Sequence, residues 1–160
     1  MFKPNFIFNS FLDLTPDFLN EKKIKALLLD VDNTLTYAHK TKTLRKGAEE
    51  WFALMRKNGI KLIVLSNAKT KRAKAFGKSI GLDVIGMSAK PLPFGYLKAA
   101  AKLKCRYCEI AMVGDQIFTD TLGANIVGIK SILVTDITPE ESLSFRIRRY
   151  LEQKIIKGAK

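Results

Sequence analysis

Cysteine and histidine are scarce: the 160 residues include only 2 Cys and 1 His. Cys105 and Cys108 cannot build a disulfide framework, so reducing, cytoplasmic surroundings are expected. A chain of this length buries about 70% of the surface that it exposes when unfolded, and folding needs no structural metal. Cys105 and Cys108 resemble half of a zinc site, but no second pair follows and the only histidine is His39. We interpret all three as residues without a metal role.

Long apolar runs are also absent, since no segment approaches the roughly 20 apolar residues that a membrane-spanning helix requires. The first residues are partly apolar, but Lys3, Pro4 and Asn5 interrupt them, and no secretion signal with a cleavage site is expected. Any membrane contact is therefore expected to be peripheral.

Acidic residues are few beside the basic ones, because 15 Asp and Glu face 28 Lys and Arg, a net charge of +13. Such a chain is attracted to polyanions, which include nucleic acid, an anionic membrane and a phosphorylated substrate. The content of charged (27%) and apolar (47%) residues is ordinary and excludes a disordered chain. One domain over residues 1–160 is expected.

Short apolar runs alternate with longer amphipathic segments along the chain. The runs predict strands at Ile24–Asp30, Ile60–Leu65, Asp83–Ile85, Ile110–Val113 and Ser131–Thr135. The segments between and after them predict helices at Lys46–Asn58, Lys69–Ile80, Phe94–Lys104, Thr119–Asn125 and Glu140–Ile156. This alternation predicts an α/β fold, in which helices cover both faces of a parallel five-stranded sheet in three layers.

Polar side chains follow three of the predicted strands, and Lys90 stands in the loop before the helix predicted at Phe94–Lys104. We expect them to converge at the sheet edge where such folds bind ligands. Asp30 and Asp32 stand one residue apart directly after a buried strand, and two carboxylates placed so close together are energetically costly unless a cation neutralises them. Carboxylates suit Mg²⁺, and Ser and Lys donate to phosphate oxygens. Each group alone is explained by a turn, a helix cap or a solvated loop, whereas all in this order predict a metal and phosphate site. The groups are Asp30, Asp32, Ser66, Asn67, Lys90, Asp115 and Asp120.

The spacing Asp30-x-Asp32-x-Thr34, then Ser66, Lys90 and Asp115-x4-Asp120, resembles the four motifs of the haloacid dehalogenase (HAD) superfamily. The resemblance covers roughly residues 20–137 and implies the superfamily's Rossmann-like three-layer fold. Residues 1–19 and 138–160 would be an aromatic and a basic helical extension. The segments 35–65 and 67–89 are too short to hold a large cap domain, so an open site is expected.

The resemblance to the superfamily's phosphatases implies a role for each motif residue. Asp30 would be the nucleophile that forms an aspartyl-phosphate, and Asp32 the acid and base. Mg²⁺ would be held by Asp30, the backbone carbonyl of Asp32 and Asp115, with Asp120 and Gln116 in support. The phosphoryl group would be bound by Thr34, Ser66, Asn67 and Lys90.

A narrower resemblance, to the YqeG-type branch of subfamily IIIA, covers nearly the whole chain. It rests on LTPD at 14–17, DVDNTL at 30–35, AKP at 89–91, GDQIFTD at 114–120 and LGAN at 122–125. The branch includes phosphatidylglycerophosphate phosphatases, which implies a lipid-borne phosphomonoester as the substrate. Ala68 departs from the branch, which commonly has an asparagine there.

Three basic clusters favour peripheral contact with the inner face of an anionic membrane. They are Lys40, Lys42, Arg45 and Lys46; Lys69, Lys71, Arg72, Lys74 and Lys78; and Arg146, Arg148, Arg149, Lys154, Lys157 and Lys160. Residues Ile147, Tyr150, Leu151 and Ile155 give the last cluster a basic amphipathic helix, which suits a membrane surface or a docked terminal helix equally. The N-terminal phenylalanines would cover a sheet edge or touch lipid.

Two other functions stay open on the sequence alone. One is a capless phosphatase for a soluble sugar or nucleotide phosphate; the octulosonate-phosphate phosphatases have GDD in the fourth motif, unlike GDQ at 114–116. The other is a basic nucleic-acid-binding module. It ranks low because the aromatic residues lie mostly N-terminal, away from the basic clusters. The oligomeric state is left open.

Overall fold

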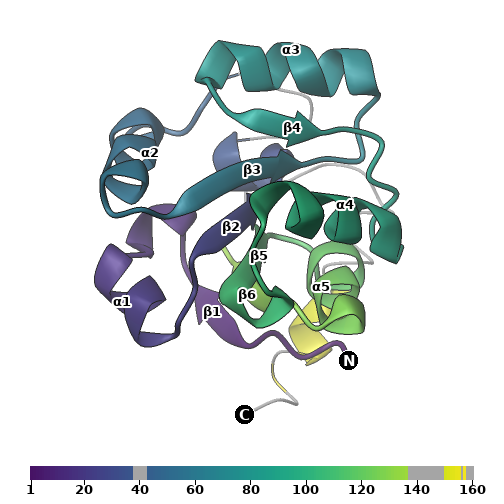
Figure 1. The fold of residues 1–160 in the computed structure, drawn as a ribbon. Helices are drawn as coiled ribbons and strands as arrows, with labels where there is room; N and C mark the ends of the chain where they lie inside the picture. The colour runs from purple at the N-terminus through teal and green to yellow at the C-terminus, as the bar shows by residue number, and fades with distance from the viewer. Residues whose placement is uncertain (38–42, 137–149, 156, 158–160) are drawn as a thin grey trace.

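A parallel sheet of six strands forms the centre of the computed structural model, which describes residues 1–37, 43–136, 150–155 and 157 (Figure 1). The strand order is β1-β6-β5-β2-β3-β4, so β2 lies inside the sheet between β5 and β3. The strands are β1 (Phe6–Phe8), β2 (Ala26–Leu29), β3 (Lys61–Leu65), β4 (Asp83–Ile85), β5 (Ile110–Gly114) and β6 (Lys130–Val134).

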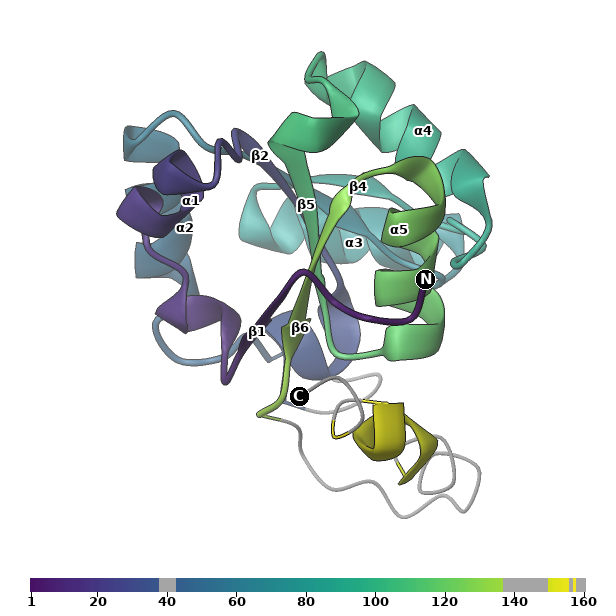
Figure 2. The same ribbon diagram turned by 90° about the horizontal axis from the view of Figure 1, so that it is seen from below.

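Helices cover both faces of the sheet, and β2 shows how the sequence builds the two layers. Leu27 and Leu29 point to the face covered by α1 and α2, and Leu28 points to the face covered by α4 and α5. All three are fully buried, as expected of a parallel strand with a continuous apolar run. Figures 1 and 2 show the sheet between these helix pairs. The helices are α1 (Pro16–Glu21), α2 (Ala48–Lys57), α3 (Thr70–Ile80), α4 (Pro93–Leu103) and α5 (Leu122–Val127).

The α/β class, the parallel sheet and its three layers are confirmed, but the expected number of five strands is wrong. The sixth strand, β1, pairs with β6 at the sheet edge, with Phe6 opposite Ile132. Only three residues long, it gives no periodic signal in the sequence. Its register is fixed instead by a residue far away in the sequence, because the backbone N–H of Ser131 donates to the Asn5 side chain at 2.7 Å.

Four of the five N-terminal phenylalanines pack against the protein, while Phe2 is 41% exposed. Phe11 is fully buried, and its ring meets Trp51 edge-on with the centroids 5.0 Å apart. The Phe18 ring stacks edge-on against Phe6 and Phe8. Phe18 belongs to α1, a helix that no pattern in the sequence predicted, although Thr15 caps it by accepting the Phe18 N–H at 3.2 Å. Of the two readings left open, this packing supports cover of the sheet edge.

The last helices differ from their predicted bounds. The predicted helix at Thr119–Asn125 is a tight turn over Ile117–Thr121 followed by α5. Of the predicted C-terminal helix at Glu140–Ile156, residues 150–155 are helical, and residues 137–149 lie outside the described part. Arg146, Arg148 and Arg149 therefore have no structural account here, as is true of His39, Lys40 and Lys42.

Candidate active site

The first motif forms a tight turn at the carboxyl end of β2. The Asp30 N–H donates to the Val113 carbonyl at 2.9 Å, which continues the β2–β5 pairing to the last residue before the turn. Asn33 then takes a left-handed conformation (φ 61°), and Thr36 closes the turn by donating its backbone N–H to the Val31 carbonyl at 3.1 Å. The central position of β2 thus holds Asp30 in the middle of the carboxyl edge.

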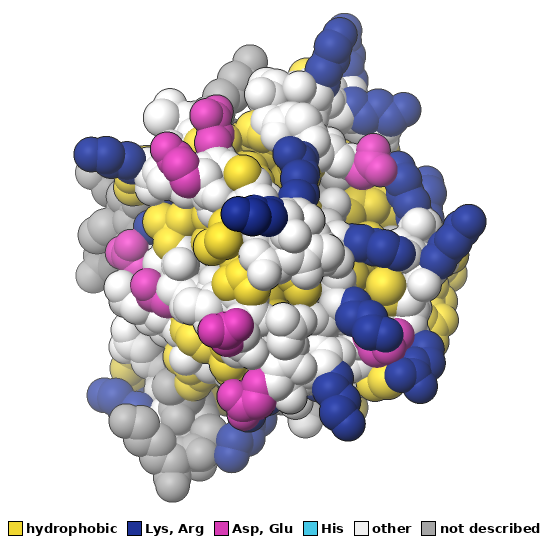
Figure 3. All heavy atoms as spheres, turned by 60° about the vertical axis from the view of Figure 1, so that its left-hand side comes forward, with side chains coloured by type: hydrophobic (Ala, Val, Ile, Leu, Met, Phe, Trp, Pro, Cys, Tyr) yellow, Lys and Arg dark blue, Asp and Glu magenta, His cyan; other side chains and the backbone are white. Residues whose placement is uncertain are grey.

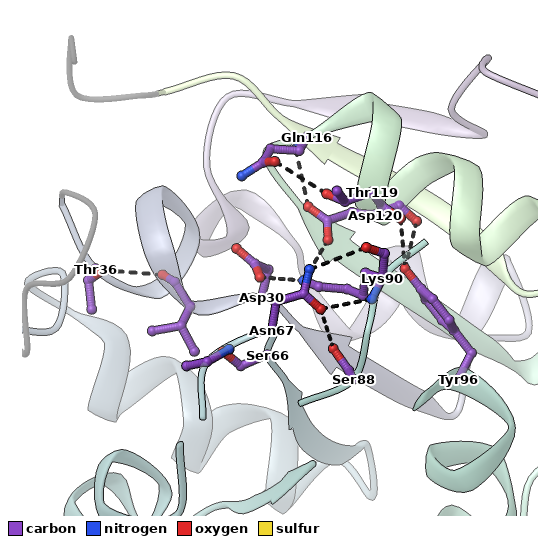
Figure 4. A network of polar contacts seen from close by, with 12 residues as sticks. Asp30, Thr36, Ser66, Asn67, Ser88, Lys90, Tyr96, Gln116, Thr119 and Asp120 are labelled. Atoms are coloured by element: carbon purple, nitrogen blue, oxygen red, sulfur yellow. Dashed lines mark hydrogen bonds and ion pairs between the residues drawn. The ribbon is translucent and has the colours of Figure 1, made fainter. Parts of the chain in front are cut away.

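Lys90 lies between two carboxylates at this edge, and the three side chains are called the carboxyl-edge triad below. The Lys90 ammonium donates to Asp30 and, at 2.7 Å, to Asp120 (Figure 4). The Lys90 side chain is only 3% exposed. A buried ammonium is stable only when it is paired. The three side chains of the triad therefore hold one another in position.

The loop that carries Lys90 is held by the second motif. The Asn67 side-chain oxygen accepts the Lys90 N–H at 2.8 Å and the Ser88 hydroxyl at 2.9 Å. The Asn67 amide donates back to the Lys90 carbonyl at 3.3 Å. The sequence predicted that Asn67 binds phosphate. The structure places its side chain in these contacts, which hold the backbone of the loop that carries Lys90, and phosphate binding by Asn67 stays a prediction.

The fourth motif brings Asp120 against the end of β5. A Cβ atom on Gly114 would stand 2.3 Å from Asp120 Oδ2, so only glycine allows this approach. The Gln116 backbone N–H donates to the same oxygen at 3.2 Å. The buried Tyr96 hydroxyl donates to the Thr119 carbonyl at 2.9 Å. No motif in the sequence predicted this contact.

Burial acts on the pKa values of Asp30 and Lys90. Burial raises the pKa of Asp30 to about 7, although the neighbouring Lys90 opposes the shift. Burial lowers the pKa of Lys90, but the charges of Asp120 and Asp30 outweigh it and the net shift is upward. The lysine therefore stays protonated, and the site carries more carboxylates than one ammonium neutralises.

Asp30, Asp115 and Asp120 form a group of buried carboxylates that suits a divalent cation. One oxygen from each lies within 4.8 Å of the others, and no other group of three or more acidic, Cys or His ligands occurs in the described part of the chain. An all-oxygen donor set of this charge fits Mg²⁺. Asp30 and Asp115 were predicted as ligands, and Asp120 joins them here. The Asp32 carboxylate lies outside the group, which leaves its predicted backbone contribution untested.

The remaining predicted residues surround the space in front of Asp30. The Thr34 hydroxyl is buried and has no hydrogen-bond partner among the described residues, which suits a ligand oxygen. The Ser66 hydroxyl accepts the Ala68 N–H at 3.1 Å, so its own hydrogen remains to be donated. Ser66 and Asp32 line the same cavity. The predicted site residues thus meet at one edge of the sheet, and their roles remain predictions.

Two charged residues act on the site from the outside. Arg45, predicted as a surface cation, is buried and donates to the Asn33 carbonyl at 3.1 Å and to Asp136 at 2.7 Å. Glu152, from the C-terminal helical residues, is buried and accepts the Ile117 N–H at 2.8 Å. Both brace the motif turns, and only contacts distant in sequence reveal them.

Comparison with known proteins shows the class of enzyme to which the chain belongs. The fold aligns with a subfamily III A hydrolase of the HAD superfamily from Legionella pneumophila (TM-score 0.56, 20% identity, 76% of this chain and 70% of that one). The chain is 29% identical to the Bacillus subtilis protein named "Probable phosphatase YqeG" over 99% of its own length and 92% of the relative's. This chain is a HAD-type phosphatase.

The family is shown by a match over most of the chain. Residues 1–138 match the family described as mitochondrial PGP phosphatase. The chain is also 30% identical to the mitochondrial phosphatidylglycerophosphatase GEP4 of Saccharomyces cerevisiae, over 84% of this chain and 78% of that protein. The chain belongs to the YqeG/PGP phosphatase family, as its motifs indicated.

Proposed function

We propose that this chain hydrolyses the terminal phosphomonoester of phosphatidylglycerophosphate, in a Mg²⁺-dependent reaction that passes through an aspartyl-phosphate on Asp30. The observation that carries the proposal is the carboxyl-edge triad, in which Lys90 pairs with Asp30 and Asp120 at the carboxyl edge of the sheet. The substrate is supported by the match to the PGP phosphatase family.

The proposed reaction has two steps. An Asp30 carboxylate oxygen attacks phosphorus, the bond between phosphorus and the leaving oxygen breaks, and Asp32 gives its proton to the departing alcohol. Asp32 then takes a proton from water, which attacks the phosphorus of the aspartyl-phosphate and releases inorganic phosphate with Asp30 restored. Lys90 binds Asp30 throughout and stabilises charge on the transferred group.

Asp30, Asp115 and the carbonyl of Asp32 would hold Mg²⁺, with Asp120 beside them. When bound, the ion neutralises charge on the phosphoryl oxygens and on the clustered carboxylates. The side chains that the sequence predicts for phosphate binding, Thr34 and Ser66, provide hydroxyl donors at the same edge.

Reversible contact with the inner, cytoplasmic face of an anionic membrane is part of the proposal. No helix among the described residues has the length and apolar character to cross a bilayer. Exposed apolar side chains instead flank Lys90 in the chain: Met87 in its loop is 67% exposed, and Phe94 at the start of α4 is 71% exposed. Lys69 follows Ala68, whose carbonyl accepts the Met87 N–H. Apolar and cationic groups at one mouth suit an anionic lipid surface.

The positive charge of the described residues is not confined to this mouth. On the face drawn in Figure 3, Lys and Arg side chains gather toward the right-hand margin, with few acidic side chains among them. A net charge of +13 attracts the whole molecule to an anionic surface. Vesicle binding should therefore weaken with added salt, because surface charges are screened over about 8 Å at physiological ionic strength.

The test is a panel of phosphomonoesters assayed for phosphate release with and without Mg²⁺. Phosphatidylglycerophosphate in anionic vesicles is compared with sugar phosphates and nucleotides, and Asp30→Asn is the inactive control. We expect the lipid to have the highest kcat/KM. A soluble sugar or nucleotide phosphate hydrolysed more efficiently than the lipid would contradict the proposed substrate and favour the soluble-substrate alternative.

A further inference from the structure

A cavity opens beside Asp32 and Ser66 at the carboxyl edge. Its volume is about 630 Å³, within the usual range of roughly 300–1,000 Å³ for small-molecule sites. It lies between the first-motif turn and α3. Its lining includes Asp32, Ser66, Lys69, Arg72, Ala75 and Phe76. The cavity thus begins at the predicted acid and runs along an apolar and cationic helix surface.

Arg72 stands at the point where this cavity meets the site. Its Nη2 atom lies 3.7 Å from Asp32 Oδ1, within ion-pair reach but beyond a hydrogen bond. The Arg72 side chain is 41% exposed. A guanidinium carries five donors in a planar fork that matches phosphate oxygens, so a loose contact with one carboxylate oxygen does not occupy it.

We propose that the cavity is the leaving-group subsite and that Arg72 binds a second phosphate group of the substrate. The inference rests on the proposed function, in which Asp32 protonates the leaving oxygen. The leaving alcohol must then lie beside Asp32, in the cavity. In phosphatidylglycerophosphate that alcohol is a glycerol, and its far end carries a phosphodiester. Arg72 is next to Asp32. The diester phosphate is separated from the leaving oxygen by one glycerol unit, and its negative charge complements the Arg72 guanidinium.

The rest of the lining suits the part of the lipid beyond the diester. Past Arg72, Ala75 and Phe76 give the cavity an apolar wall on the same face of α3. Lys69 and Lys71 lie at the start of the helix and add positive charge at the cavity rim. In the lipid, the diester anion is followed by hydrocarbon, which matches the order of cations and then apolar side chains along the cavity. A simple sugar phosphate has no hydrocarbon part and does not match this order.

The opposing interpretation is that Arg72 only orients Asp32. That role predicts an equal loss of turnover on every phosphomonoester, because all of them need the same proton. The subsite predicts a loss confined to substrates with the second phosphate, expressed mainly in KM. The two are separated by a pair of soluble substrates: glycerol 3-phosphate, and the deacylated substrate glycerophosphoglycerol phosphate, which keeps both phosphates and lacks the acyl chains.

The experiment compares kcat and KM of wild type, Arg72→Gln and Arg72→Lys on this pair, with Lys78→Gln as the matched control. Lys78 lies exposed on the same helix, loses the same charge and does not line the cavity. We expect Arg72→Gln to lower the preference for the two-phosphate substrate by about tenfold to a hundredfold, as for a lost charge-assisted hydrogen bond. Arg72→Lys should recover part of it, and Lys78→Gln should leave it unchanged.

Several results would overturn the subsite. They are an equal loss on both substrates, an unchanged preference in Arg72→Gln, and a wild-type enzyme that does not prefer the second phosphate. Failure of the proposed function is a separate result: wild type that hydrolyses the deacylated compound in an Arg72-dependent way but ignores the lipid would support the subsite while contradicting the lipid substrate.

Discussion

The two edges of the sheet each hold one charged side chain between two of opposite sign, and they behave in opposite ways. At the carboxyl edge, buried Lys90 lies between Asp30 and Asp120. At the amino edge, Glu109 pairs with Lys25 at 2.7 Å and with Arg106 at 3.0 Å. The Glu109 side chain is 9% exposed, but its partners are 66% and 78% exposed. The cations of the amino edge therefore lie in water, whereas the cation of the carboxyl edge is buried.

The pKa values record this difference. Hydrogen bonds from Arg106 and Lys25 lower the pKa of Glu109 to about 2, the ordinary result for a carboxylate beside cations. Asp30 also contacts a cation, yet burial raises its pKa to about 7. The ion pairs of the amino edge stabilise the fold. The carboxyl edge keeps an excess of buried negative charge, which a further cation would neutralise.

The largest expected effect is that of Asp30→Asn, which should lower turnover by more than about a thousandfold, since removal of a covalent nucleophile has effects of this size or larger. An amide neither attacks phosphorus nor binds Mg²⁺ well. Phosphate release from purified variant is the measurement. The variant should stay folded, because it replaces a carboxylate that burial disfavours. Substantial residual activity would rule out the covalent mechanism.

Lys90→Met should destabilise the protein by about 3–5 kcal/mol, as for a buried ion pair that loses one partner. Lys25→Met at the amino edge should cost less than about 1 kcal/mol, because its pair is solvated. Urea unfolding of both variants measures the difference. Equal losses would show that the two edges are electrostatically alike, contrary to the difference in their burial.

Removal of Mg²⁺ with a chelator should stop turnover without unfolding the chain, since the core is built of apolar side chains. Protons should also compete with the ion. The metal-free pKa of Asp30 is about 7, and only the carboxylate binds metal, so affinity should fall by up to about tenfold per pH unit below that value.

Calorimetric titration of Mg²⁺ at several pH values from 6 to 8 would measure this competition. An affinity that does not change over this interval would contradict the raised pKa of Asp30. Global unfolding on chelation would instead indicate a structural metal, and would reopen the question of Cys105 and Cys108.

The smallest effect is expected at the amino edge, from Glu109→Gln. A lowered pKa means that Glu109 stabilises the fold fully above its ordinary pKa of 4.5, and that this contribution is lost as the pH falls through about 2. Wild type and variant should therefore differ slightly in unfolding free energy at neutral pH and converge in acid, with activity unchanged. A difference that grows toward low pH would contradict the lowered pKa of Glu109.

The same two edges show how far the sequence predicts the site. The carboxyl edge was predictable because Asp30, Ser66 and Asp115 each follow a continuous apolar strand, and parallel strands end on one side. The motifs therefore identified Asp30, Lys90 and Asp115 as neighbours without knowledge of their contacts.

The parts that were missed depend on partners distant in sequence. The three residues of β1 form a strand only because Asn5 is held at Ser131. Arg45 looked like one of many surface cations, and only its contact with the Asn33 carbonyl makes it part of the site. Glu152 reaches Ile117 from a helix whose periodicity fitted two orientations equally. Composition and spacing do not encode such contacts.

The most direct test of the central claim is to trap the phosphorylated enzyme. Asp32→Asn removes the base that activates water, and 4-nitrophenyl phosphate has a leaving group that needs no proton, so the first step should proceed and the second should slow. The acid-quenched variant should gain the mass of one phosphoryl group, located by peptide mapping at Asp30 and absent from a variant that also carries Asp30→Asn. Turnover of the ester with no phosphorylated protein at any quench time, or a phosphoryl group on another residue, would contradict the account.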